Sequence, residues 1–252
     1  MLSKYSITLS ARSKNPLTHM AIFLQENFKG LELTNIDSIF GFSDPCRLYG
    51  GRIFYGPELT DMDLHWMYDN NIGYRIPLSN FLANEEIYKE SKSFLDKHHQ
   101  EGNSVIVMKD ALAEWIKNDY PKYSVECSVT KEVNTVAKLE KVLKLYDTVV
   151  PLPEAFNTDY ELLSMLPQEV KDRVRLFLNV GCAYKCPGRV CYGAMSKINM
   201  QIEGAKFECS QENNKQYVPT GMTEFDLAKY LELGYTRFKL LRMKPSLIPT
   251  GY

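Results

Sequence analysis

Four of the six cysteines of this 252-residue chain fall between positions 182 and 209. They are separated by three, four and seventeen residues, in the order Cys182, Cys186, Cys191 and Cys209. Thiolates gathered in one segment are the usual ligands of a structural zinc ion or of an iron–sulfur cluster. The paired two-residue spacings of zinc ribbons are absent, so the spacing favours a [4Fe–4S] cluster, with zinc as the alternative cofactor. A third interpretation is four unrelated thiols in one cysteine-containing loop.

The sequence before Cys182 indicates where this segment lies. The apolar run 174–180 predicts a strand that leads directly into the first cysteine. In a parallel barrel the carboxyl ends of the strands carry the active site, so we expect the cysteine-rich loop, 181–210, at the barrel mouth. The other two cysteines, Cys46 and Cys127, stand apart and are expected to pack as small hydrophobic side chains. Cys46 lies in an irregular stretch and is kept as an alternative ligand.

Basic side chains gather in and next to the last predicted strand, 236–241. Alternation along a strand places Arg237 and Lys239 on one face, and Arg242 follows the strand. If that face lines the barrel mouth, these side chains could bind a carboxylate or a phosphate. The alternative is a solvated edge. We predict all three as catalytic or substrate-binding residues.

A carboxylate and two hydroxyls follow other predicted strands. Glu154 comes just after the strand 148–152 and is a candidate general acid or base. Its alternative role is a carboxylate at the amino terminus of a helix. Ser128 and Thr130 end another predicted strand and could line the same mouth.

The elements that must position these residues alternate between strands and helices. The predicted strands are 5–10, 31–34, 52–55, 73–77, 104–108, 123–129, 148–152, 174–180 and 236–241. The predicted helices are 16–28, 60–71, 84–100, 110–119, 132–144, 159–172 and 223–233. Repeated strand and helix units with short connections predict an α/β fold with a parallel sheet. Eight or nine strands favour a TIM-type barrel, regular or irregular, in a single domain over 1–252; an open doubly wound sheet is the alternative.

Composition narrows the class of protein. Hydrophobic residues make up 44% and charged residues 24%, which is typical of a globular chain and not of a disordered or collagen-like one. Thirty basic residues against 31 acidic ones predict no strong nucleic-acid patch. We expect no membrane span, because no apolar run reaches about 18 residues. No secretion signal precedes the six cysteines, which predicts a reducing, cytoplasmic location.

Several segments between positions 102 and 242 carry soft motifs. They are 104–107, Tyr120-Pro121, 125–128, Leu152-Pro153-Glu154, 175–182, 188–191 and 234–242. In this order they resemble the collagenase-like peptidase family of unassigned catalytic type, called here the U32-like family. The chain resembles a short, divergent member. It departs from the family pattern at Leu240 and Leu241, where a glutamate and a glycine are usual, and before Glu154, where an arginine is usual.

The resemblance implies a TIM-type barrel and an iron–sulfur protein. The well-understood members are oxygen-independent hydroxylation proteins that use a [4Fe–4S] cluster, and their substrates include the ubiquinone ring and bases of RNA. By the motif match, Cys182, Cys191 and Cys209 carry over as cluster ligands, and Cys186 is the fourth expected ligand. Some members work as heterodimers, which implies a protein partner as a further expectation.

The resulting hypothesis is an iron–sulfur enzyme that hydroxylates, or otherwise modifies by redox chemistry, an aromatic ring or nucleobase in a small substrate. Three alternatives stay open. The chain could be a non-catalytic or heterodimer partner whose metal site is structural, a radical enzyme that uses S-adenosylmethionine, or a peptidase. The radical class expects a Cys-x3-Cys-x2-Cys spacing near the first strand, and no nucleophile constellation supports a peptidase.

Overall fold

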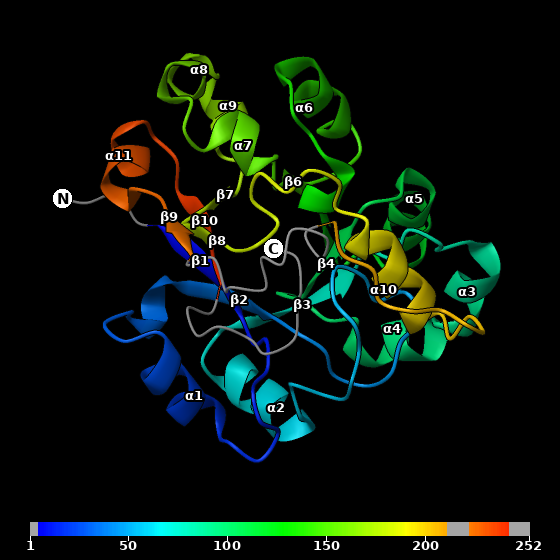
Figure 1. Ribbon diagram of the computed structural model, residues 1–252. Helices are drawn as coiled ribbons and strands as arrows, with labels where there is room; N and C mark the ends of the chain where they lie inside the picture. Colours follow the sequence, from blue (N-terminus) through cyan, green and yellow to red (C-terminus); the bar gives the residue numbers. More distant parts are fainter. Residues whose placement is uncertain (1–4, 211–221, 242–252) are drawn as a thin grey trace.

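The structure, a computed structural model, describes residues 5–210 and 222–241. Eight parallel strands within these residues form one sheet in the order β6-β5-β4-β3-β2-β1-β10-β7 (Figure 1). The strands are β1 (Ser6–Ser10), β2 (Ile36–Phe40), β3 (Gly73–Leu78), β4 (Ser104–Val107), β5 (Ser124–Cys127), β6 (Thr148–Val149), β7 (Leu176–Phe177) and β10 (Arg237–Leu240). The predicted α/β fold with a parallel sheet is confirmed.

The sheet curls until its two edge strands, β6 and β7, approach each other. A single parallel bridge joins Val149 to Val174, with hydrogen bonds from the Val149 N–H to the Arg173 carbonyl and from the Arg175 N–H to the Val149 carbonyl, both 2.9 Å. No longer ladder connects these edges within the described residues. The fold is therefore a curled, TIM-like sheet that lacks the continuous closure of a regular barrel, which corrects the prediction of a closed one.

Helices surround the strands, as parallel connections require. Figure 1 shows most of them on the outside of the curled sheet. The helices are α1 (Met20–Asn27), α2 (Asp61–Asp69), α3 (Glu85–Glu90), α4 (Lys92–His98), α5 (Asp110–Asp119), α6 (Val136–Val142), α7 (Pro153–Phe156), α8 (Tyr160–Met165), α9 (Gln168–Lys171), α10 (Cys191–Asn199) and α11 (Leu227–Glu232). A small antiparallel pair, β8 (Asn179–Val180) and β9 (Thr223–Glu224), lies beside the sheet. No described helix is long and apolar enough to cross a membrane.

Two predicted strands are wrong. The stretch 31–34 leads into a short 3-10 helix, Leu33–Asn35, and the strand begins only at Ile36. The stretch 52–55 is irregular because its backbone pairs with a side chain instead of a strand. The Phe54 N–H donates to the Asn199 Oδ1 at 2.8 Å, and the Asn199 Nδ2 donates to the Arg52 carbonyl at 2.7 Å.

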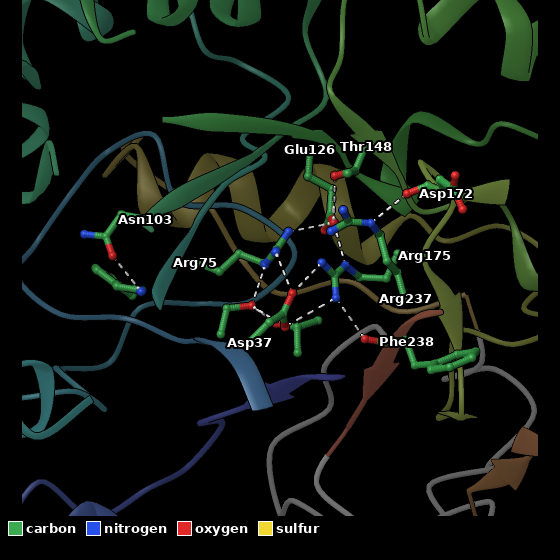
Figure 2. A network of polar contacts seen from close by, with 12 residues as sticks. Asp37, Arg75, Asn103, Glu126, Thr148, Asp172, Arg175, Arg237 and Phe238 are labelled. Carbon is green, nitrogen blue, oxygen red and sulfur yellow. Dashed lines mark hydrogen bonds and ion pairs between the residues drawn. The ribbon is translucent and has the colours of Figure 1, made fainter. Parts of the chain in front are cut away.

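The interior of the curled sheet holds an ionic network (Figure 2). Arg75 donates to the Glu126 carboxylate at 2.6 Å, and Arg175 donates to the same oxygen at 2.9 Å. Arg175 also reaches Asp37 at 2.9 Å, and Thr148 donates to Glu126 at 3.2 Å. Burial acts to raise the pKa of Glu126, but Arg75 and Arg175 outweigh burial and hold that pKa below its ordinary value. Branched apolar side chains usually fill this layer of a barrel.

Candidate functional site

The thiols of the four clustered cysteines lie near enough to influence one another electrostatically. Cys191 is the first residue of α10 and is buried. Burial raises the pKa of Cys191 to about 12, and the thiols of Cys182, Cys209 and Cys186 raise it further. No group of three or more His, Cys, Asp or Glu side chains arranged to hold a metal ion is found in residues 5–210 and 222–241. The four-cysteine ligand set therefore stays a prediction.

The cysteine segment is tied to the barrel rim by Glu154 in α7. One carboxylate oxygen accepts from the Lys185 N–H at 2.5 Å and from the Arg189 guanidinium at 2.5 Å. Arg189 also pairs with Glu132 at 3.1 Å. Lys185 and Arg189 have φ values of 56° and 47°, a left-handed conformation that costs free energy in residues other than glycine. The contacts with Glu154 stabilise that conformation and so fix the turn between the cysteines.

A second contact connects the segment that carries Cys209 to the turn before Cys191. The Val190 N–H, directly before Cys191, donates to the Ser210 Oγ, directly after Cys209, at 3.2 Å. A side chain at Gly188 would meet the same oxygen, since a Cβ there would lie 2.7 Å from it. Glycine therefore permits the close approach that places Cys209 beside the other thiols.

Helix α10 fixes the cysteine segment against the loops that follow β2 and β3. The Ser196 Oγ accepts from the Phe81 N–H at 3.1 Å, and Asn199 donates to the carbonyls of Tyr49 at 2.9 Å and Arg52 at 2.7 Å. These loops leave the carboxyl ends of the strands. Helix α10 therefore begins, at Cys191, on the mouth side of the sheet.

A narrow pocket opens at this mouth next to the cysteine segment. Its volume is about 40 Å³, and its lining includes Ser128, Thr130, Lys239 and Tyr192, the residue after Cys191. Lys239 is only 6% exposed, and its ammonium lies 4.3 Å from the centre of the Phe40 ring. The pocket combines the Lys239 amine and the Arg52 guanidinium with the hydroxyls of Ser79, Ser128, Thr130 and Tyr192.

Lys239 has an unusual electrostatic environment. Burial lowers the pKa of its amine to about 8; Glu126 opposes this shift, and Arg75, Arg175 and Arg52 favour it. An ordinary lysine has a pKa of about 10.4. The neutral, nucleophilic form of Lys239 is accordingly accessible near pH 8.

A larger cavity of about 350 Å³ lies between the loops that follow β1 and β2. Arg52 lines both this cavity and the narrow pocket. The cavity walls contain Lys14, which pairs with Asp63 at 2.8 Å, and Glu58, which accepts two bonds from Arg52. Its volume falls within the range of small-molecule sites, about 300–1,000 Å³.

The structure separates the predicted basic residues. Lys239 reaches the mouth, whereas Arg237 lies at the amino-terminal end of β10 and donates to the Asp172 carbonyl at 2.6 Å. Arg242 lies outside the described residues. Glu154 contacts the cysteine segment, and its role in proton transfer stays a prediction.

Cys46 and Cys127 lie apart from the thiols that act on Cys191. Burial raises the pKa of Cys127, which is fully buried in β5, and raises that of Cys46 to about 11. The Cys46 thiol donates to the Ser91 Oγ at 3.8 Å. Both thiols pack within the fold, as the sequence predicted.

Sequence reasoning missed the ionic network and the contacts of Arg189. A signal was present for the network, because Glu126 and Arg175 each interrupt an apolar strand at an inward position. Charged residues are rarely buried without a partner, so two such interruptions of opposite sign indicate a pair. No comparable signal exists for Arg189, which lies in an irregular turn.

Comparison with known proteins shows the fold. A solved structure described as the U32 peptidase Mk0906 superimposes with a TM-score of 0.62 at 16% sequence identity, covering 97% of this chain and 94% of the other. No family profile and no curated protein matches the sequence. The chain has the fold of this U32 peptidase, and at that level the predicted resemblance to the U32-like family is confirmed.

Proposed function

We propose that the chain is a U32-like iron–sulfur enzyme that hydroxylates, or otherwise modifies by redox chemistry, an aromatic ring or nucleobase without using oxygen. The observation that supports the proposal is that the thiols of Cys182, Cys186 and Cys209 act electrostatically on Cys191, in a chain with the fold of a U32 peptidase. This group stands at the mouth of a TIM-like sheet, where enzymes of this architecture build their active sites. Tyr192 links the two features, because it follows Cys191 and lines the mouth pocket.

The spacing of the four cysteines favours a cluster over a single zinc ion, because the paired two-residue spacings of zinc ribbons are absent. A [4Fe–4S] cluster would bind each of the four thiolates through a different iron. Zinc stays the alternative cofactor.

The cluster would be held by Cys182, Cys186, Cys191 and Cys209. When bound, it would supply electron transfer through four thiolate ligands, or a Lewis-acidic iron if only three ligands bind. The chain's own groups do the rest. Glu154 holds the cysteine turn, and Lys239 presents its amine to the mouth pocket.

The substrate we propose is a small aromatic or nucleotide-like molecule. The 350 Å³ cavity beside the mouth has the volume for one, and Arg52 joins it to the pocket that contains Lys239. Lys239, Arg75 and Arg175 outnumber the interior carboxylates of Asp37 and Glu126. The remaining positive charge favours a substrate that carries an anionic group.

The test is metal and sulfide analysis of protein purified without air. We expect about four iron and four sulfide per chain and a brown colour. The variant Cys182→Ser should lose bound iron, whereas Cys127→Ser should keep it because that thiol lies in the core of β5. Colourless protein with one zinc would support a structural site instead. Metal-free wild-type protein would overturn the proposal.

A further inference from the structure

Lys239 differs from the other buried cations of the molecule. Five lysine and arginine side chains are buried in the described residues, namely Lys14, Arg52, Arg75, Arg175 and Lys239. The first four each form an ion pair with a carboxylate. Lys239 has no hydrogen bond or ion pair in the described part of the chain, and its amine contacts only the rings of Phe40 and Phe177, at 4.3 and 5.6 Å.

The charges around Lys239 explain why it has no counter-ion among the described residues. Glu126 on β5 acts on it electrostatically, but Arg75 on β3 and Arg175, directly before β7, already bind that carboxylate. Arg52, from the loop after β2, adds a further positive charge. A lysine that is desolvated beside other cations tends to lose its proton and become a nucleophile.

The pocket supplies what an amine needs to react with a carbonyl group. The Ser128 and Thr130 hydroxyls lie 2.8 Å apart and line the pocket together with Lys239. A hydroxyl can donate a proton to a carbonyl oxygen and accept one back. The volume of about 40 Å³ admits only a small group, because one water occupies about 30 Å³ in the liquid.

We propose that Lys239 is a carbonyl-reactive lysine, which forms an imine with a small aldehyde or ketone at the barrel mouth. The amine lone pair forms a C–N bond as the carbonyl π bond breaks; the nitrogen gives up one proton and the oxygen takes one up, which gives the carbinolamine. The carbinolamine then loses water: the nitrogen gives up its second proton, the hydroxyl takes up a proton as the C–O bond breaks, and a C=N bond forms. No oxidant or reductant is consumed. The Ser128–Thr130 hydroxyl pair carries the protons. The proposal does not depend on the cluster.

The experiment is reductive methylation of the intact chain with formaldehyde and cyanoborohydride, followed by peptide mass spectrometry. The quantity measured is the rate at Lys239 divided by the rate at exposed lysines such as Lys89, at pH 7 and at pH 10. Taking a pKa of about 8 for Lys239 and about 10.4 for an ordinary amine, the ratio should fall on the order of 60-fold between these pH values. Limited access to the pocket slows methylation of Lys239 equally at both pH values, so it does not affect the change in the ratio. A ratio that does not change with pH, or no methylation of Lys239 in folded protein, would overturn the proposal.

Matched variants separate reactivity from access. Lys14 is also buried but pairs with Asp63, so it should stay unmodified in the folded protein. Ser128→Ala should slow methylation of Lys239 several-fold at both pH values, because the proton carrier is lost while the amine remains. Lys239→Arg should abolish the modification and retain bound iron. An unchanged rate in Ser128→Ala would contradict the role of the hydroxyl pair, and iron-free wild-type protein that still shows the pH-dependent ratio would contradict only the cluster.

Discussion

The carboxylate of Glu154 contacts two left-handed residues of the cysteine segment, Lys185 and Arg189. A single side chain thus stabilises two strained conformations in a turn that carries Cys186 and leads to Cys191. Sequence analysis selected Glu154 for its position after a strand and assigned it acid or base chemistry. The structure shows a holding function for the same residue.

Weakening this contact should loosen the cysteine segment. In Glu154→Gln the side chain keeps its shape but loses the ion pair with Arg189. We expect the free energy that stabilises the folded cysteine segment to fall by about 1–2 kcal/mol. Iron should then pass to a chelator on the order of 5-fold faster, measured by absorbance under anaerobic conditions. The control is Glu132→Gln, because Glu132 pairs with the same Arg189 but is 49% exposed and should contribute little. Equal rates for Glu154→Gln and wild type would contradict the holding function.

Helix α10 was not predicted from the sequence, because it lies inside the segment that was interpreted as a cysteine-rich loop. Cys191, Ala194, Met195 and Ile198 do recur at helical spacing, but Cys191 was assigned to ligand chemistry and the pattern was therefore not used. The strand β4 was predicted correctly because burial on both faces gives a continuous apolar run, and the helix α5 because burial on one face gives a helical period. The predicted strand 52–55 failed because Asn199, 144 residues or more away along the chain, takes its backbone hydrogen bonds.

Removing that side chain should destabilise the loop at the mouth. Asn199→Ala leaves the Phe54 N–H and the Arg52 carbonyl without the Asn199 side chain as their partner, whereas the Tyr49 carbonyl still accepts from Asn80, and we expect a loss of about 2–3 kcal/mol in the free energy of unfolding. Urea unfolding and limited proteolysis of the loop 41–60 would measure the effect. Lys197→Ala on the exposed side of the same helix should change stability by less than about 0.5 kcal/mol. Similar curves for both variants would show that the loop is held by other contacts.

For the molecule as a whole, the buried ionic network makes stability depend on acid pH. The pKa values of Asp37 and Glu126 are lowered in the folded state, since two arginines outweigh the effect of burial. Their contribution is therefore fully present above the unfolded values, about 3.9 and 4.3, and is lost as the pH falls through the lower folded values. Sequence periodicity predicted the sheet around this network, but a period reports which face is buried and not which charges meet there.

Glu126→Gln should be costly at neutral pH. Among the described residues it leaves Asp37 as the one carboxylate that still pairs with Arg75 and Arg175, and we expect a loss of about 3 kcal/mol in the free energy of unfolding. Chemical denaturation at several pH values should also show a smaller loss of stability below pH 4 than in wild type, because the group that would bind a proton is gone. Glu101→Gln, at an exposed position, should match wild type at every pH. A wild-type acid dependence in Glu126→Gln would assign the effect to other carboxylates.

The single bridge between Val149 and Val174 lies next to a buried ion-pair network. Arg175 follows the bridge, and its guanidinium reaches across the interior to Glu126 on β5 and Asp37 on β2. In the described residues one backbone bridge connects the two edges of the sheet, and the ion pairs of Arg175 connect them again through the interior. Separation of the two edges would break the ion pairs of the buried Arg175 with Glu126 and Asp37, which is costly because the guanidinium is desolvated. The contact between these two edges, which has a single backbone bridge in the described residues, is thereby reinforced by buried ion pairs.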